Sequence, residues 1–332
     1  MLRFAAASSS GFALLSAAFL LLSAQPSPPR QSPPPPVAFR ADVQLVSVTL
    51  SVRDPAAGGR LVTGLTQNDF TITEDGVPQV ISFFSPSANL PLALGLLVDA
   101  SGSQEEFFKD HRRHLRAFLR TVLTPRDQAF VLAFGNRLRL LSDFTPSAEV
   151  LLTSLDEKQR SRSEAPQLGP REIRILGTAF YDAVVHSIAE KLTGLQQQRK
   201  GLILFSDGED NSSAHHLLDA IEAAQSAAVP IFSIRYTEPA KDRRLTARNK
   251  YGISVMARLA RETGGADFDA AQSDLASAFA AIGEQLHGSY ELAYNSTNPA
   301  PPGGNGGFRK IVIRVPARPG LLVRHKSGYA VH

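Results

Sequence analysis

A group of oxygen-bearing side chains follows the apolar run Pro91–Val98. In the segment Asp99-Ala100-Ser101-Gly102-Ser103, one carboxylate and two hydroxyls alternate with small residues. Alternate side chains in a tight strand-to-helix loop can point the same way, so Asp99, Ser101 and Ser103 can converge on one point. Carboxylate, hydroxyl and water oxygens suit a hard divalent cation such as Mg²⁺ or Mn²⁺. The spacing therefore predicts a metal site at the end of this run.

Two other segments offer oxygen ligands at comparable places. Asp207 follows the apolar run Lys200–Phe205 within Ser206-Asp207-Gly208, which puts a second carboxylate at the end of a strand. Thr178 comes just before a helix that begins at Ala179, where its hydroxyl can both cap the helix and face the metal. We expect these groups to meet the first segment at one edge of a sheet.

Short apolar runs alternate with amphipathic helices throughout residues 90–287. This alternation predicts a mostly parallel sheet that helices cover on both faces. In such sheets ligands bind outside the carboxyl ends of the strands, where the strand order reverses. The expected strands are Pro91–Val98, Ala129–Phe134, Arg137–Leu141 after a Gly135-Asn136 turn, Lys200–Phe205, Val229–Tyr236 and Ala266–Phe268.

The two ends of the chain have a different pattern, in which apolar and polar residues alternate as in half-buried strands. Asp75-Gly76 separates two such strands and predicts a two-residue hairpin turn. Neither end has enough strands to bury a face alone, so we infer that both ends pair into one β-sandwich around the middle segment. Two separate small β modules are the alternative. The expected strands are 43–52, 70–74, 77–84, 290–294, 310–315 and 320–324.

The N-terminus has the features of an export signal. Arg3 precedes a short apolar stretch, Gly11–Leu22, and the small residue Ala24 offers a cleavage site. The stretch is shorter than the roughly 20 residues that a membrane-spanning helix needs, although an uncleaved anchor is the alternative. The Pro-rich segment Pro26–Pro36 then predicts a stiff, extended spacer. No later segment is long and apolar enough to span a membrane.

Composition excludes several classes of function. The 332 residues carry a net charge of +4, far from the concentrated positive charge of a nucleic-acid-binding protein. There is no cysteine, which excludes disulfides, cysteine-ligated zinc, iron–sulfur clusters and a thiol nucleophile. We therefore expect no nucleic-acid partner.

The elements DASGS, GTAFYDA and LILFSDGEDN occur in this order along the chain. Together they resemble the metal-ion-dependent adhesion site of a von Willebrand factor type A domain, over residues from Leu90 to about His287. The resemblance implies that Ser101, Ser103 and Thr178 ligate the metal directly, and that Asp99 and Asp207 hold it largely through water. The flanking segments EDGVPQVISFF and RHKSGYAV are similar to exported bacterial proteins built around such a domain.

We therefore predict an α/β fold with a doubly wound, mostly parallel six-stranded sheet. This is the Rossmann-like type A fold, with strand order 3-2-1-4-5-6, inserted in a small β-sandwich. The expected parts are a signal peptide (1–24), a Pro-rich linker (25–40), a discontinuous sandwich (41–87 and 288–332) and a type A domain (88–287).

The expected function is binding rather than catalysis. Neutral hydroxyl ligands leave a Mg²⁺ or Mn²⁺ ion much of its charge and one open position, which an Asp or Glu of a partner protein can fill. The protein would then be an exported adhesion or interaction module in the periplasm or outside the cell. The alternatives are an assembly subunit of an envelope complex and a Mg²⁺-dependent hydrolase, which usually needs a second carboxylate where this chain has Ser101.

Other residues with possible chemistry have simpler interpretations. Acidic residues such as Glu105 and Glu106 are favoured at a helix start by its dipole, although a second cation site is the alternative. The pairs His215-His216 and His111/His114 lack acidic or cysteine partners in zinc-like spacing, so we expect solvated helix faces. Asp182 and Asp210 are expected to cap helices or lie on the surface. Two basic segments, 158–174 and 241–250, would rim the metal and favour an anionic ligand.

Overall fold

The computed structural model describes residues 45–86, 90–100, 113–157, 166–169, 177–195, 198–236, 245–299 and 307–331. Residues Val43–His332 belong to one compact unit. The expected signal peptide and linker lie outside the described residues, as do Ser101, Ser103, Glu105, Glu106 and His111. Most of the basic residues of segments 158–174 and 241–250 also lie outside them.

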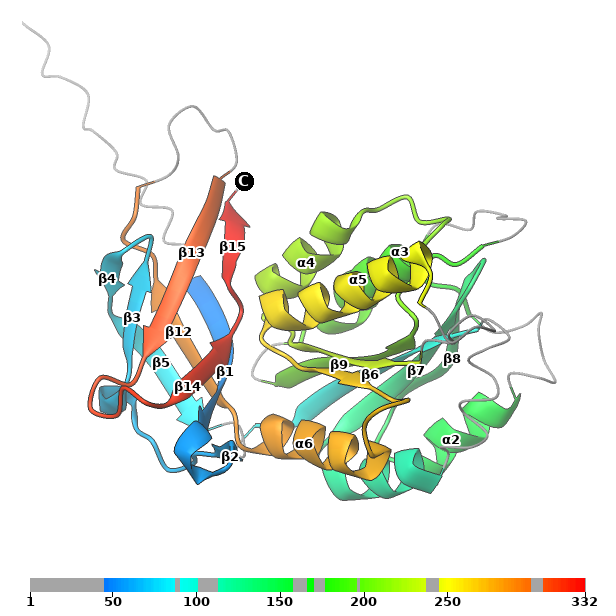
Figure 1. The fold of residues 1–332 in the computed structure, drawn as a ribbon, viewed down its shortest axis with the longest axis horizontal. Coiled ribbons are helices and arrows are strands. Elements are labelled where there is room, and N and C mark those ends of the chain that lie inside the picture. The colour runs from blue at the N-terminus through cyan, green and yellow to red at the C-terminus, as the bar shows by residue number, and fades with distance from the viewer. Residues whose placement is uncertain are drawn as a thin grey trace, which may run out of the picture. The chain divides into compact units, whose positions relative to one another are not determined.

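A six-stranded sheet forms the centre of the middle segment (Figure 1). Its order is β11-β10-β9-β6-β7-β8, which is 3-2-1-4-5-6 when the strands are counted along this segment and read from β8. Only β7 and β8 pair antiparallel among these strands. The expected order and the mostly parallel pairing are thus confirmed. The strands are β6 (Leu92–Asp99), β7 (Gln128–Phe134), β8 (Leu138–Thr145), β9 (Arg199–Ser206), β10 (Ile231–Arg235) and β11 (Asp267–Asp269).

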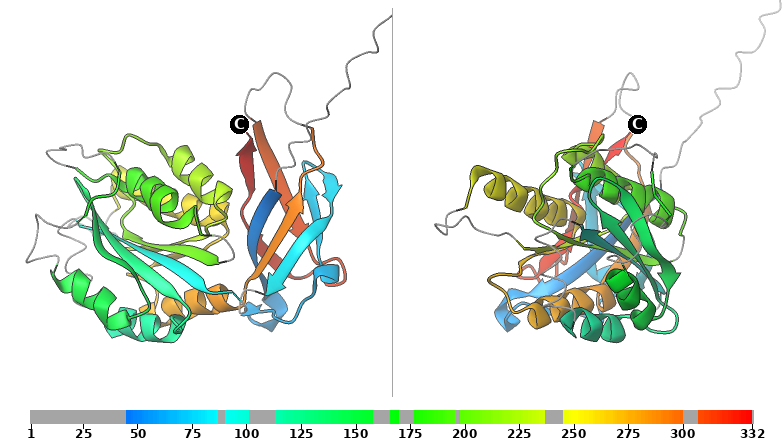
Figure 2. Two further views of the ribbon diagram at one scale, coloured as in Figure 1. Left: turned by 180° about the vertical axis from the view of Figure 1, so that it is seen from behind. Right: turned by 90° about the vertical axis from the view of Figure 1, so that its right-hand side faces the viewer.

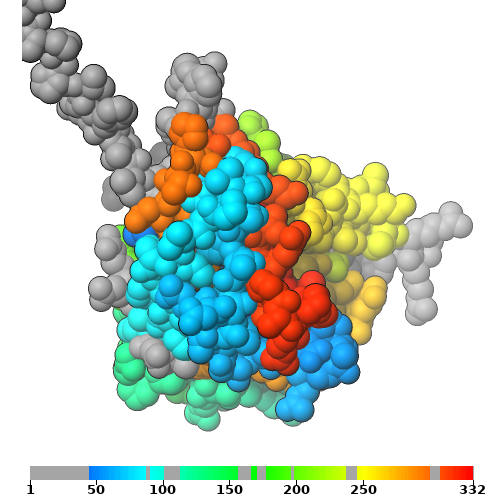
Figure 3. Space-filling model, turned by 90° about the vertical axis from the view of Figure 1, so that its left-hand side faces the viewer, coloured from blue at the N-terminus to red at the C-terminus, as the bar shows by residue number. Residues whose placement is uncertain are grey.

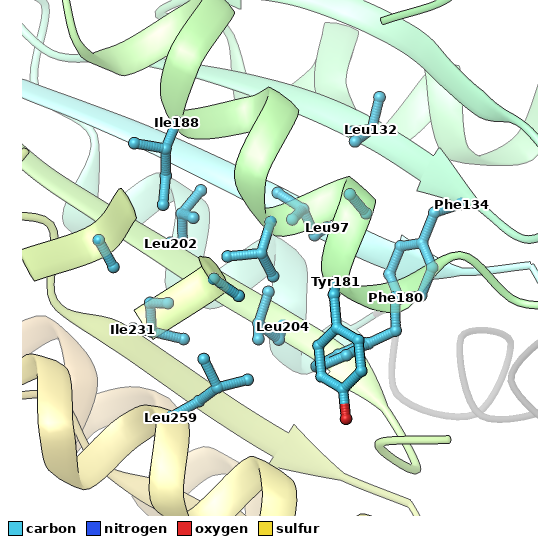
Figure 4. Packing of buried hydrophobic residues seen from close by; sticks show 14 of the residues in the cluster. Leu97, Leu132, Phe134, Phe180, Tyr181, Ile188, Leu202, Leu204, Ile231 and Leu259 are labelled. Atoms are coloured by element: carbon cyan, nitrogen blue, oxygen red, sulfur yellow. The ribbon is translucent and has the colours of Figure 1, made fainter. Parts of the chain in front are cut away.

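Helices cover both faces of this sheet (Figure 1). Residues 113–122, α2 (Ala148–Glu157) and α6 (Leu275–His287) pack on one face. On the other face lie α3 (Phe180–Ser187), its π-helical extension Ile188–Leu192, α4 (Leu217–Ser226) and α5 (Ala247–Thr263). Every residue of β6 is buried, because a strand with helices on both faces exposes neither set of side chains. Figure 4 shows Leu97, Leu202 and Phe180 in the core between the sheet and these helices.

Strands from both ends of the chain pair with one another (Figures 2 and 3). In the first sheet, β1 lies between β14 and β12, and β12 also pairs with the edge strand β5. In the second sheet, β13 lies between β15 and β3. The strands are β1 (Leu45–Asp54), β2 (Arg60–Leu61), β3 (Thr71–Glu74), β4 (Val77–Gln79), β5 (Ile81–Pro86), β12 (Tyr290–Asn295), β13 (Gly307–Arg314), β14 (Leu322–His325) and β15 (Gly328–Val331).

The hairpin around Asp75-Gly76 forms as expected, since both turn residues have positive φ, 50° and 85°. The expected single strand 77–84 is wrong. It divides at Val80 into β4, which pairs with β3, and β5, which pairs with β12 in the other sheet. Alternation in sequence shows which residues can be half buried but does not show that a chain crosses between sheets.

A carboxylate anchors the interior of these paired chain ends. Glu74 is fully buried and accepts hydrogen bonds from the hydroxyls of Tyr294 (2.7 Å), Ser296 (2.6 Å) and Tyr329 (2.9 Å) and from the amide of Asn298 (2.8 Å). One residue of the N-terminal half thus links β3 to β12, to β15 and to the segment after β12.

No helix among the described residues is long and apolar enough to cross a membrane.

Candidate metal centre

The carboxyl ends of β6 and β9 lie side by side, because the two strands pair in parallel with Val98 opposite Phe205. Asp99 is 1% exposed, and its Oδ2 accepts a hydrogen bond of 2.9 Å from the hydroxyl of Ser206. The Ser206 hydroxyl also accepts from the backbone N–H of Gly208 at 3.1 Å. The two strand ends are therefore joined, and the loop that carries Asp207 begins beside Asp99.

The Asp207 loop has a fixed shape. Asp207 Oδ1 accepts from the backbone N–H of Glu209 at 3.0 Å, and Gly208 has φ +81°. A Cβ on Gly208 would lie 2.4 Å from the carbonyl oxygen of Gly252, and a Cβ on Gly252 would lie 2.3 Å from that of Asp207. Helix α5 thus packs its backbone directly on this loop, and the close approach requires glycine at both places.

Thr178 joins the same group of loops. Its N–H donates to Asn211 Oδ1 at 2.7 Å, and the Asn211 N–H donates back to the Thr178 carbonyl at 3.2 Å. The turn after β7 completes the arrangement, because the N–H of Ala179 donates to Gly135 O and that of Ala100 donates to Phe134 O. The structure therefore places the end of β6, with Asp99, beside the loops that carry Thr178 and Asp207 at one edge of the sheet.

Comparison with solved structures finds several similar proteins. The chain is similar to an aerotolerance-related membrane protein from Bacteroides fragilis (14% identity, 59% of this chain and 98% of that one, TM-score 0.43). It is also similar to the vWF domain of the type V pili tip protein Mfa5 from Porphyromonas gingivalis (12% identity, 59% and 95%, TM-score 0.39). A third similar structure is mussel byssus proximal thread matrix protein 1 with a zinc-occupied MIDAS motif (13% identity, 65% and 50%, TM-score 0.44).

This chain resembles von Willebrand factor type A domain proteins. No protein-family model and no curated protein sequence matches it. Because all three TM-scores are below 0.5, the roles of individual residues depend on the motifs and on the geometry of the loops.

The start of α3 differs from the expectation for Thr178. We expected the Thr178 hydroxyl to cap this helix, but the N-cap position is Ala179 and no side chain of its own caps it. Asp210 acts instead, since its Oδ1 accepts from the N–H of Phe180 at 2.8 Å. The expectation that Asp210 is a capping residue is thus confirmed, and the capping role of Thr178 is wrong.

Asp182 and His215 also differ from expectation. Asp182 is 1% exposed and accepts from the N–H groups of Ala214 and His215, both at 3.0 Å, and from His215 Nδ1 at 2.8 Å. It therefore holds the loop before α4 and is not a surface residue. His215 has an acidic partner that sequence spacing did not indicate, because the two residues are 33 positions apart.

Glu209 lies next to this group of residues, and the sequence analysis missed it. Burial raises its pKa, and the neighbouring Asp207 and Asp99 charges raise it further, while Arg248 lowers it. Arg248 Nε lies 2.6 Å from Glu209 Oε2. Its place directly after Asp207-Gly208 was the only signal in the sequence. Three carboxylates thus concentrate negative charge at this edge, and a cation bound there would offset it.

The donor set determines what this edge can hold. Within the described ranges, no group of three His, Cys, Asp or Glu side chains could hold a metal ion. A cation here would need hydroxyl or water oxygens in addition to carboxylates, which is the donor set that hard divalent cations accept. The residues that the structure places here, Asp99, Thr178 and Asp207, fit that requirement.

Proposed function

We propose that this protein is an exported, metal-dependent interaction module that captures an acidic group of a partner protein. The observation that carries the proposal is the convergence of Asp99, Thr178 and Asp207 on adjoining loops, with Asp99 tied to the Asp207 loop through Ser206. A surface that gathers these residues from three separate parts of the chain can bind a cation that none of the three segments could hold alone.

In the proposed site, Ser101, Ser103 and Thr178 contribute hydroxyl ligands, and Asp99 and Asp207 act largely through water. The buried Ser206 hydroxyl orients Asp99, and Asn211 fixes the backbone of Thr178. A bound Mg²⁺ or Mn²⁺ would supply a positive charge with one coordination position open. Because most of the proposed direct ligands are neutral, a carboxylate from outside is the favoured sixth ligand.

The proposed location follows from the sequence, which has an N-terminal export signal before a Pro-rich spacer. The compartment is the periplasm or the cell exterior.

Binding is favoured over hydrolysis by the way the carboxylates are engaged. Asp99 is buried and accepts from Ser206, Asp207 accepts from its own loop, and Glu209 forms an ion pair with Arg248. A hydrolase would need one of these groups to be a nucleophile or base that can reach a substrate.

Affinity capture tests the proposal. The full mature chain would be immobilised and incubated with solubilised cell envelope in the presence of excess Mg²⁺. Bound proteins would then be eluted with chelator. We expect a protein that elutes with chelator and is absent when the bait is Thr178→Ala. Thr121→Ala, which changes an exposed residue of the helix 113–122, is the control bait and should capture the same protein. Equal capture by the Thr178→Ala bait, or capture that persists in chelator, would contradict the proposal.

A further inference from the structure

Two histidines far apart in the sequence lie next to each other, one in α3 and the other in the loop before α4. The rings of His186 and His215 have centroids 5.5 Å apart and an interplanar angle of 80°. Their side chains are 17% and 35% exposed, so both can be reached from solvent. Neither residue belongs to the metal edge described above.

Each imidazole is held through its Nδ1 by a carboxylate. Asp182 Oδ1 lies 2.8 Å from His215 Nδ1, and Glu190 Oε1 lies 3.2 Å from His186 Nδ1. An ionised carboxylate only accepts hydrogen bonds, so Nδ1 of each ring carries the hydrogen. In the neutral ring, Nε2 then has the lone pair.

The two carboxylates are themselves fixed. Asp182 is buried and accepts from two backbone N–H groups, those of Ala214 and His215. Glu190 Oε1 also accepts from the N–H of Gly169 at 2.7 Å. A carboxylate that orients a histidine by its outer nitrogen is the usual support of a metal-binding imidazole.

The separation of the rings suits a shared metal ion. With a metal–nitrogen distance of about 2.0–2.1 Å and tetrahedral angles, two imidazole centroids on one ion lie roughly 5 Å apart. Gly169 adds a second feature, because a Cβ there would lie 2.8 Å from Nε2 of His186. The same Cβ would lie 2.7 Å from Cδ2 and 3.0 Å from Cγ, so it would press on the face of the ring, and glycine at this place lets His186 keep its position.

We propose that His186 and His215 form a second metal site, specific for a borderline divalent transition metal such as Zn²⁺, with Asp182 and Glu190 as positioning residues. Imidazole nitrogen suits Zn²⁺, whereas Mg²⁺ and Mn²⁺ prefer oxygen ligands, so the two metal sites differ in chemistry. No third His, Cys, Asp or Glu joins them in the part of the chain that the structure describes, so water completes the coordination.

Zinc titration of the full chain tests this site. Calorimetry would be run with excess Mg²⁺ and in an Asp99→Ala background, so that the oxygen-lined edge does not contribute. We expect His186→Ala and His215→Ala each to lower the Zn²⁺ affinity at least tenfold, and Glu190→Gln to lower it about tenfold or more through the lost orientation of His186. His216→Ala changes an exposed neighbour and should leave the affinity unchanged.

Nitrogen chemical shifts of the histidine rings give a readout that does not depend on the stability of a variant. In the metal-free protein, we expect the hydrogen on Nδ1 of both rings, and Zn²⁺ should shift the Nε2 resonances of His186 and His215 while leaving that of His216 in place. Absence of Zn²⁺ binding in the Asp99→Ala background would overturn the proposal. Unchanged affinity in the double variant H186A/H215A, or shifts confined to other histidines, would also overturn it.

Discussion

The Ser206 hydroxyl donates a 2.9 Å hydrogen bond to Oδ2 of Asp99, and both residues are buried at the ends of neighbouring parallel strands. The same hydroxyl accepts from the N–H of Gly208. One side chain therefore sets both the orientation of the first carboxylate of the proposed site and the start of the loop that carries the second.

Replacing Ser206 with alanine should weaken metal binding more than it weakens folding. The change removes the hydrogen bond to the charged Asp99, which contributes about 1.5–3 kcal/mol, together with the one from the Gly208 N–H, and it leaves the strand backbone intact. Outer-sphere partners of metal ligands typically change affinity by about 10–100-fold, so we expect at least a tenfold weaker Mn²⁺ affinity by calorimetry. Ser82→Ala is the control, because it removes a hydrogen bond from the Ser82 hydroxyl in β5 to the carbonyl oxygen of Ala293. Equal Mn²⁺ affinity in Ser206→Ala and Ser82→Ala would show that Asp99 needs no such orientation.

Replacing Gly252 with alanine should disturb the Asp207 loop from a neighbouring helix. The new Cβ would lie 2.3 Å from the Asp207 carbonyl, so α5 or the loop must move. We expect a loss of about 1–3 kcal/mol in the free energy of unfolding, together with weaker Mn²⁺ binding. Both would be measured by denaturation and calorimetry on the same samples.

Gly283→Ala is the matched control for Gly252→Ala. Gly283 lies within α6, where an added Cβ meets its nearest atom, on Phe118, at 3.9 Å. Alanine there should stabilise the helix by up to about 1 kcal/mol without affecting the metal. If Gly252→Ala and Gly283→Ala have the same Mn²⁺ affinity, the close contact between α5 and the Asp207 loop has no role in metal binding.

The sequence shows the sheet and its motifs because both are local patterns. A short, continuous apolar run such as Leu92–Val98, set between amphipathic helices, is typical of a strand buried on both faces, and the residues that follow such runs then lie at the carboxyl edge. Asp99 and Asp207 could therefore be assigned to one edge before any coordinates were known.

The contacts that the sequence did not show join residues that are distant in the chain. The Asp182–His215 and Glu209–Arg248 pairs depend on how loops from different helices meet, and no spacing rule connects them. Asp210 was expected to be a capping residue, but the sequence did not show which helix it caps, and the start of α3 was assigned to Thr178 because a threonine before a helix is a locally preferred cap.

Glu74 should make the stability of the protein sensitive to acid. Burial raises its pKa, but hydrogen bonds from Ser296, Tyr294, Asn298 and Tyr329 outweigh burial, so the folded pKa lies below 4.5. The unfolded state then binds the proton more readily, and this part of the stability is present above pH 4.5 and lost as the pH falls through the folded pKa.

Glu74→Gln should remove the part of the acid sensitivity of folding that comes from Glu74. It should also lower the free energy of unfolding at pH 7 by about 3 kcal/mol, because an amide cannot replace all the acceptor positions of the carboxylate. Urea denaturation from pH 7 to pH 3 would measure both effects. Glu149→Gln, on the exposed face of α2, is the control. A variant with the same acid dependence as the wild type would show that other carboxylates determine it.

Deleting residues 288–332 should leave the N-terminal strands without partners. β1 would lose β12 and β14, and β3 would lose β13, which exposes the apolar faces of Val48, Leu50 and Ile72. We expect the fragment 41–287 to aggregate, as measured by light scattering. A monomeric fragment with cooperative thermal unfolding would contradict a sandwich built from both chain ends.

Calorimetric titration of the mature chain with Mn²⁺, repeated with Asp99→Ala, Ser101→Ala and Thr178→Ala, tests the proposed metal centre most directly. We expect a single oxygen-lined site in the wild type and no measurable binding in the three variants. Each variant should keep a cooperative thermal unfolding transition, because none of the three changes removes an apolar side chain of the core. Unchanged Mn²⁺ affinity in all three variants would contradict the assignment of the metal centre to these loops.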